Sequence, residues 1–252
     1  MSEFLPAPRS GRGSRTERPL PVAGEQAVPL GASAAARGER RRYRTSYHDA
    51  CGIARALDVV GERWALLVVR ELLLGPQRFG DLRRALRAVS SNLLTDRLRE
   101  LEGHGVVSRR TLPPPAGAVV YQLTESGREL EPAVLALGGW GLRVPMPASP
   151  TVSATSVLLF LRGSHHHDPT EPPATCAIEL GDRTWTVSSA AGRLHIQAGE
   201  PAVADARLRT DPATLNTVLA EPAMLDNHLA DGSIAVDGDL ATARRLLGAD
   251  SS

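Results

Sequence analysis

The sequence predicts an α+β protein with two domains of different construction. Three observations lead to this prediction. Apolar residues recur at helical spacing from about residue 50 to residue 102, and two short strand-like runs follow them. Beyond residue 148, strand-like runs separated by Gly, Pro and Asp come before two helical segments. Strands followed by helices favour an α+β arrangement over a parallel α/β sheet.

The composition changes along the chain and divides it into three parts. Residues 1–46 hold few large apolar residues and no sustained period, which predicts a disordered basic tail. The run "RGERRRYR" at its end could contact phosphates or could simply be solvated. Residues 47–144 are predicted to form the first domain and residues 150–249 the second, with "VPMPASPT" as the linker.

The net charge of +1 is unevenly distributed. Nine Arg stand against four acidic residues in 1–47, and 13 stand against 11 in 48–148. In 149–252 seven Arg stand against 13 acidic residues. A basic front and an acidic rear indicate a polyanion partner for the front half only.

The sequence also indicates the compartment. No apolar run approaches the roughly 20 residues of a membrane span, and the N-terminal region lacks the apolar core of a signal peptide. We therefore expect a cytoplasmic protein with no membrane partner. Cys51 and Cys176 are the only cysteines, and both are expected to be reduced in that compartment.

Five helices and one hairpin are predicted for the first domain. Helix ends are expected at Gly61, at Gly75-Pro76 and at Gly103, and Thr124 is an N-cap. Proline cannot donate to a sheet ladder, so "PPPAGA" is predicted to be a loop between two strands. The predicted helices are 53–60, 62–74, 79–86, 91–102 and 125–141, and the strands lie in "GVVSRRTL" and "AVVYQL".

The helix at 91–102 is expected to have two distinct faces. At about 100° per residue, Leu94, Leu98 and Leu101 fall on one side and must point inward. The opposite side presents Asn92, Thr95, Asp96 and Arg99, whose amide, hydroxyl and charged groups suit base edges and phosphates. Ser90 and Ser91 precede them at the helix N-terminus, where free N–H groups and the helix dipole favour a phosphate oxygen.

A helix, a short turn, a second helix and a basic hairpin, in that order, describe a winged helix-turn-helix, whose second helix enters the major groove. Eight Arg stand against four acidic residues between Arg78 and Arg110. A helical bundle with ordinary solvated arginines is the alternative, although a bundle needs neither a wing nor the serines. The residues expected to bind DNA are Arg78, Arg83, Arg87, Ser90, Ser91, Asn92, Thr95, Asp96, Arg97, Arg99, Arg109 and Arg110.

Two long stretches of this region resemble a known family. They are "CGIARALDVVGERWALLVVRELLLGPQRFGDLRRALRAVSSNLLTDRLRELEGHGVVSRR" and "VVYQLTESGRELEPAVLALGGWG". They are similar to the HxlR-type winged-helix transcriptional regulators. The resemblance implies a homodimer on an inverted-repeat operator in double-stranded DNA. Where family members often carry Lys, this chain has Asn92, which leaves the operator sequence open.

The resemblance also implies roles for the first and last helices and for Cys51. These helices would form the dimer interface, although core packing alone also explains their apolar residues Ile53, Leu57, Leu130, Val134, Leu137 and Trp140. In some relatives an N-terminal cysteine senses electrophiles or oxidants, and a thiol at a helix N-terminus can have a lowered pKa. The alternative for Cys51 is a buried small apolar side chain.

The second domain resembles the sterol-carrier-protein type. Five strand-like runs are expected in "SVLLFLRG", "ATCAIELG", "RTWTVSSA", "RLHIQAG" and "ARLRTD", and one more in "GSIAVDGD". The pattern "ARLRTDPATLNTVLA…LADGSIAVDGDLATARRLL" carries the resemblance, which implies a sandwich of helices on a mostly antiparallel sheet around an apolar tunnel. An apolar small molecule would be its ligand. The candidate lining residues, which plain core packing would also explain, are Trp185, Leu215, Val218, Leu219, Met224, Leu225 and Leu229.

Catalytic motifs are not apparent. There is no Gly-x-Ser-x-Gly, no phosphate loop and no spaced Cys or His set, so we expect neither an enzyme nor a cofactor nor a metal. The run His165–His167 is expected to be a polar loop. The leading hypothesis is a homodimeric repressor whose DNA binding responds to an apolar ligand. A lipid or metabolite carrier, with the front half used for dimerisation, is the alternative, and an enzyme acting inside the tunnel has the least support.

Overall fold

The computed structural model describes residues 46–114, 117–145, 151–164 and 169–249. The predicted tail at 1–46 lies outside these ranges except for its last residue, and the run His165–His167 lies wholly outside them. Within the ranges described, no helix has both the length and the apolar character needed to cross a membrane.

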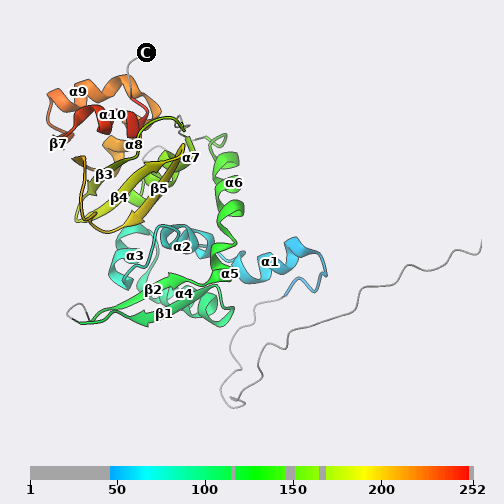
Figure 1. Ribbon diagram of the computed structural model, residues 1–252. Helices are drawn as coiled ribbons and strands as arrows, with labels where there is room; N and C mark the ends of the chain where they lie inside the picture. Colours follow the sequence, from blue (N-terminus) through cyan, green and yellow to red (C-terminus); the bar gives the residue numbers. More distant parts are fainter. Residues whose placement is uncertain (1–45, 115–116, 146–150, 165–168, 250–252) are drawn as a thin grey trace, which may run out of the picture. The chain divides into compact units, whose positions relative to one another are not determined.

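The front half has the predicted order of helices and hairpin. Leu82, Leu94 and Leu101 are completely buried in its core. The predicted helices at 53–60, 79–86 and 91–102 are confirmed to within one residue at each end. The elements are α1 (Gly52–Val60), α2 (Ala65–Leu72), α3 (Phe79–Ala85), α4 (Ser91–Gly103), β1 (Val107–Thr111), β2 (Val119–Leu123), α5 (Glu125–Arg128) and α6 (Glu131–Gly141) (Figure 1).

Two of the predicted helices differ from the structure. The helix expected over 125–141 is divided into α5 and α6 because Pro132 has no N–H to donate and its ring would clash with the carbonyl of Arg128 in a continuous helix. The helix expected from residue 62 begins only at Ala65. Its N-cap, Trp64, has a φ of 80°, a left-handed conformation that ends any helix on its N-terminal side.

The rear half is a five-stranded sheet with helices. The strand order is β5-β4-β3-β6-β7, and only the β3–β6 pair is parallel, which confirms a mostly antiparallel sheet. The elements are α7 (Ala154–Ser164), β3 (Ala174–Leu180), β4 (Arg183–Ala190), β5 (Arg193–Ala198), β6 (Ala206–Thr210), α8 (Pro212–Ala220), a 3₁₀ turn η1 (Pro222–Met224), α9 (Leu225–Ala230), β7 (Ala235–Gly238) and α10 (Leu240–Leu247) (Figure 1).

The prediction of a strand at "SVLLFLRG" is wrong, because this segment forms most of α7. The hydroxyl of Ser153 accepts a hydrogen bond from the N–H of Ser156 at 3.1 Å and so begins the helix. Val157, Leu158 and Leu161 are then fully buried at helical spacing. A short apolar run between polar residues fits a buried strand and a buried helix equally well, and only tertiary packing distinguishes them.

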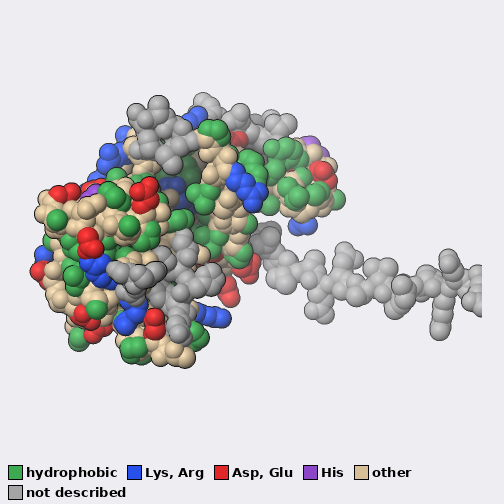
Figure 2. All heavy atoms as spheres, turned by 90° about the horizontal axis from the view of Figure 1, so that it is seen from above, with side chains coloured by type: hydrophobic (Ala, Val, Ile, Leu, Met, Phe, Trp, Pro, Cys, Tyr) green, Lys and Arg blue, Asp and Glu red, His purple; other side chains and the backbone are tan. Residues whose placement is uncertain are grey.

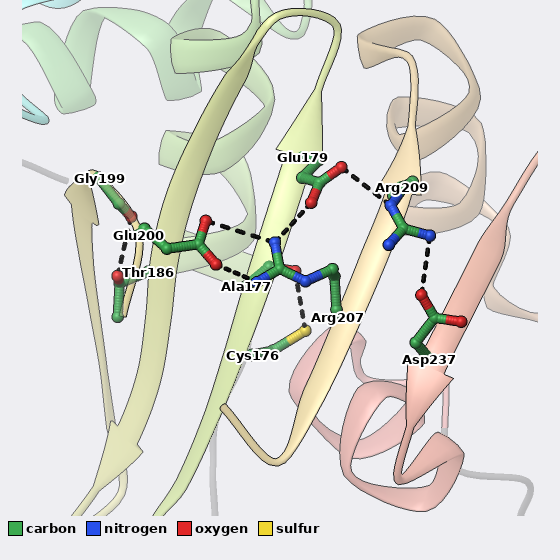
Figure 3. Close-up of polar contacts among 9 residues, drawn as sticks. All are labelled: Cys176, Ala177, Glu179, Thr186, Gly199, Glu200, Arg207, Arg209 and Asp237. Atoms are coloured by element: carbon green, nitrogen blue, oxygen red, sulfur yellow. Dashed lines mark hydrogen bonds and ion pairs between the residues drawn. The ribbon is translucent and has the colours of Figure 1, made fainter. Parts of the chain in front are cut away.

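The two faces of the sheet have opposite character. Side chains of Ile178, Trp185 and Leu208 point into one core with α7, α8 and α10. The other face carries a row of ion pairs across three strands (Figure 3). There Arg207 lies between the carboxylates of Glu200 and Glu179, and Arg209 lies between those of Glu179 and Asp237.

Direct contacts join the two halves, which belong to one compact unit over residues 45–252. The N–H of Ala198 donates to the carbonyl oxygen of Leu74 at 3.0 Å, and the Leu74 side chain is buried in the core of the rear half. An ion pair of 2.8 Å links Arg84 of α3 to Asp182, in the turn between β3 and β4. The front half is therefore docked on the rear half through the end of α2 and through α3.

Candidate nucleic-acid interface

The N-terminus of α4 is held in place by the side chains of Ser90 and Arg83. Ser90 is the N-cap, and its hydroxyl oxygen accepts from the N–H of Leu93 at 3.3 Å. Arg83 of α3 donates from Nε to the hydroxyl of Ser91 at 3.3 Å and from Nη1 to the carbonyl of Arg87 at 3.5 Å. The second helix of the motif is thus fixed to the first by the side chain of Arg83.

The outward face of α4 carries the polar groups that the sequence predicted. Asn92, Asp96 and Arg99 are exposed. Asp96 and Arg99 form a loose ion pair of 3.9 Å, so the carboxylate lies where it can orient the guanidinium. Thr95 is only half-buried, and its hydroxyl donates to the carbonyl of Ser91 at 2.9 Å, which leaves the oxygen's lone pairs for another donor.

The expectation for Arg97 requires a correction. Arg97 is only 6% exposed and pairs with the carboxylates of Glu100 and Glu62. It belongs to the buried stripe of α4 because Leu94, Arg97, Leu98 and Leu101 follow i, i+3, i+4, i+7 spacing. A side chain in this position is not placed to reach DNA.

The wing adds two exposed arginines to this surface. Arg109 and Arg110 lie on β1, opposite Tyr121 and Val120 of β2. The tip of the hairpin, at residues 115–116, lies outside the described residues. The exposed arginines among the predicted DNA contacts are therefore Arg78, Arg87, Arg99, Arg109 and Arg110.

A second surface, on α1 and α6, is apolar. Ile53 is 73% exposed, Leu137 51% and Trp140 61%, while Leu57 is at 40%. None of the residues of α6, all of which the structure describes, is buried. Figure 2 shows hydrophobic side chains gathered on the surface of α1. Leu130 and Val134 are half-buried against the front core, so for these two the alternative of core packing holds in part.

Cys51 lies exposed at the N-cap position of α1. The backbone N–H groups of Ala54 and Ile53 lower the pKa of its thiol because they stabilise the thiolate. The alternative of a buried, inert side chain does not fit this exposure. Cys176 is buried in the rear core, and burial raises the pKa of its thiol to about 11.

The candidate ligand-lining residues lie almost entirely within closed packing. Met224 and Leu229 are half-buried. The other five, which are buried in the core of the rear half, are Trp185, Leu215, Val218, Leu219 and Leu225. Trp185 also lines a cleft that sequence reasoning did not anticipate. A charged residue inside the apolar run "VVRELLLG" was the available signal, because Glu71 is buried beside the cleft.

Two family models match this chain. The model for the HxlR-like helix-turn-helix matches residues 59–148, and the model for the SCP-2 sterol transfer family matches residues 173–249.

Several known proteins are similar to parts of the chain. The uncharacterized HTH-type transcriptional regulator sll1512 of Synechocystis sp. is 41% identical over 87 residues, which is 34% of this chain and 64% of that protein, so just under two thirds of its length is matched. The uncharacterized HTH-type transcriptional regulator Rv3095 of Mycobacterium tuberculosis is 36% identical over 135 residues, covering 53% of this chain and 82% of that protein. Among solved structures, the redox regulator HypR in its oxidized form is 36% identical, covers 38% of this chain and 100% of that one, and has a TM-score of 0.36.

Proposed function

This chain belongs to the HxlR-like helix-turn-helix family and is a transcriptional regulator, and we propose that it is a homodimeric repressor of an inverted-repeat operator. The observation that carries the proposal is the outward face of α4, where Asn92, Asp96 and Arg99 are exposed on a helix whose start is braced by Arg83. A helix of this kind enters the major groove of B-form DNA and presents its first turns to base edges.

Different residues have different parts in this proposal. Asn92 and Arg99 would read base edges, since an amide matches adenine and a guanidinium matches guanine. Arg78, Arg87, Arg109 and Arg110 would bind phosphates on either side and fix the position of the helix without specifying sequence. Ser90 and Ser91 would receive a phosphate oxygen at the helix N-terminus.

The apolar surface on α1 and α6 supports the dimer. Large apolar side chains that remain exposed on α1 and on α6 indicate a protein–protein contact. Two copies related by a twofold axis would place their α4 helices on two half-sites about one helical turn apart, which is why the operator is proposed to be an inverted repeat. A dimer bound across a promoter would repress by occupying the site that polymerase needs.

The rear half supports control by a small molecule. Its match to the SCP-2 sterol transfer family and its docking on α2 and α3 favour a domain that senses a ligand and shifts the dimer between two states. Such control requires that the ligand binds the two states with different affinity.

The test begins with an operator obtained by repeated capture of random DNA duplexes on the full chain. Binding to the selected duplex is then measured by fluorescence anisotropy for the native protein, Asn92→Ala and Arg99→Ala. Arg193→Ala is the matched control, because Arg193 is an exposed arginine on β5, outside the proposed surface. We expect each α4 variant to lose about 1–3 kcal/mol of binding free energy for the selected duplex. Equal affinity in all four proteins, or no enriched duplex at all, would overturn the proposal.

A further inference from the structure

A cleft of about 620 Å³ lies where the front half meets the rear half. α2 and α3 contribute Trp64, Leu67 and Arg84 to its walls, and the rear half contributes Arg183 and Trp185. Its volume is within the range of about 300–1,000 Å³ that small-molecule sites occupy. The aromatic and aliphatic side chains give the cleft an apolar wall beside a charged one.

Trp185 is a buried donor without an acceptor. The residue is 1% exposed, and its indole Nε1–H has no hydrogen-bond partner among the residues that the structure describes. Leaving a buried N–H unpaired costs free energy, so such groups in folded proteins generally have a partner. An acceptor atom of a ligand in the cleft would supply one.

Arg183 is a half-buried cation next to this donor. Its guanidinium carbon lies 4.7 Å from the centre of the Trp185 ring. Burial lowers the pKa of Arg183, while the negative charges of Asp81, Glu71 and Asp182 act in the opposite direction. Arg183 nevertheless forms no ion pair within 4.0 Å with any residue in the described ranges.

Two other arginines that line the cleft are already paired. Arg70 pairs with Glu71 at 2.5 Å, and Arg84 pairs with Asp81 at 2.6 Å and Asp182 at 2.8 Å. A negatively charged ligand would therefore meet Arg183 as the cation with unused donors, with the Trp185 N–H beside it. A planar carboxylate matches a guanidinium with two parallel hydrogen bonds.

We propose that this cleft binds a small aromatic carboxylate, with the carboxylate on Arg183 and Trp185 and the ring against Trp64 and Leu67. The ligand site thus lies between the two halves rather than inside the closed core of the rear half. Its walls include groups from both halves, so a bound ligand contacts the front half directly.

The same cleft reaches the proposed DNA surface. Arg87 and Ala88, in the turn between α3 and α4, line it as well. Arg87 is exposed and is one of the residues proposed to bind phosphate, so the negative charge of a ligand in the cleft would oppose the approach of a DNA phosphate to this end of the cleft. This step rests on the proposed function. Binding of the carboxylate then weakens operator binding, and operator binding weakens carboxylate binding by the same factor.

The site is tested by isothermal titration calorimetry of the full chain with 2-naphthoate and with its neutral analogue 2-naphthamide. We expect the amide to bind at least tenfold more weakly than the carboxylate. Arg183→Gln is expected to weaken the binding of 2-naphthoate at least tenfold. Trp185→Phe keeps an aromatic ring in the core but has no N–H, and it is expected to weaken the binding at least fivefold. Arg193→Gln, the exposed arginine on β5, should bind 2-naphthoate within twofold of the native protein.

Two results would overturn the site: no binding of 2-naphthoate by the native protein, or equal binding by the native protein and Arg183→Gln. If Arg183→Gln fails to fold by circular dichroism, Trp185→Phe decides in the same way. Fluorescence anisotropy with the selected operator then tests the coupling. Saturating 2-naphthoate should weaken operator binding by the native protein at least fivefold and leave operator binding by Arg183→Gln unchanged. Loss of the coupling alone would leave the site standing, and failure to bind any duplex would overturn the proposed function and not the site.

Discussion

The hydroxyl of Ser153 donates to the carboxylate of Glu71 across a distance of 2.7 Å, and this bond joins the start of α7 to α2. Glu71 is 1% exposed, so its charge depends on a few direct partners. Besides Ser153, Arg70 is a partner of this carboxylate, and its Nε and Nη2 donate to the same oxygen at 3.0 and 2.5 Å. Burial of a carboxylate is tolerated only when such partners are present.

Replacement of Ser153 by Ala should lower the free energy of unfolding by about 1–3 kcal/mol, because it removes a donor from a buried carboxylate and the cap of α7 together. Urea denaturation followed by circular dichroism measures this. Ser188→Ala, on the polar face of β4, is the control and should change the value by less than about 0.5 kcal/mol. Equal losses in the two variants would contradict the role of the Ser153–Glu71 bond.

Arg97 and Arg99 should respond differently to the same change. Arg97→Met is expected to lower the free energy of unfolding by roughly 1–2 kcal/mol, because Glu100 and Glu62 each lose a charged partner. Arg99→Met should leave the free energy of unfolding unchanged and weaken binding of the selected operator instead. Thermal unfolding and fluorescence anisotropy on both variants separate the effects, and a specific loss of operator affinity in folded Arg97→Met would contradict the buried position of Arg97.

Asp239 gives the stability of α10 a defined pH dependence. Its carboxylate accepts from the hydroxyl of Thr242 at 2.7 Å and from the N–H of Ala241 at 3.0 Å, and the Thr242 bond is the main reason that its pKa is lowered. A carboxyl whose pKa is lower in the folded state contributes stability above its unfolded pKa of about 4, and loses that contribution as the pH falls through the folded value. We expect native protein to exceed Asp239→Ala in unfolding temperature at pH 7, with the part due to the charge disappearing as the pH falls below the folded pKa of Asp239. A difference that does not change with pH would contradict this.

Cys51 should be the more reactive thiol. At pH 7 we expect iodoacetamide to modify Cys51 at least tenfold faster than Cys176, because the pKa of the first is lowered and burial raises that of the second to about 11. Mass spectrometry of the two peptides over time gives both rates, and Cys51→Ala isolates the slow one. Equal rates would remove the basis for any oxidant-sensing role of Cys51.

Leu137→Glu should convert the proposed dimer to a monomer without unfolding it, because Leu137 is already 51% exposed within one chain. Val203→Glu, which changes an exposed apolar residue of the rear half, is the control and should keep the native mass. Sedimentation equilibrium distinguishes the two states. A native protein that is monomeric at micromolar concentration would contradict the dimer itself.

The parts of the fold that depend on local signals were predictable from the sequence. α1 ends before Gly61, and α4 begins after the Ser90 cap and ends at Gly103, since these groups act on their own neighbours. α7 was not predictable, because its apolar run fits a strand until its packing against α2 and α8 is known. Pro132 was a local signal for the break between α5 and α6, and the longer apolar pattern concealed it.

The candidate site was predictable to a similar extent. The face of α4 that carries Asn92 and Arg99 follows from the helical period alone. The burial of Arg97 beside Leu94 and Leu98 follows from the same period, but its pairing with Glu62, which lies 35 residues earlier in the chain, does not. The buried charge of Glu71 was the one signal for the cleft, and its position could not be predicted because its walls come from both halves.

The hydrogen bond from Ala198 to Leu74 has a consequence for the sheet as a whole. Ala198 ends β5, which is an edge strand because it pairs with β4 alone. Open edges expose unpaired backbone groups that invite another chain to add a strand. The carbonyl of Leu74, two residues after the end of α2, accepts from one of these groups, the N–H of Ala198. The front half therefore covers one end of the β5 edge, where another chain could otherwise begin to add a strand.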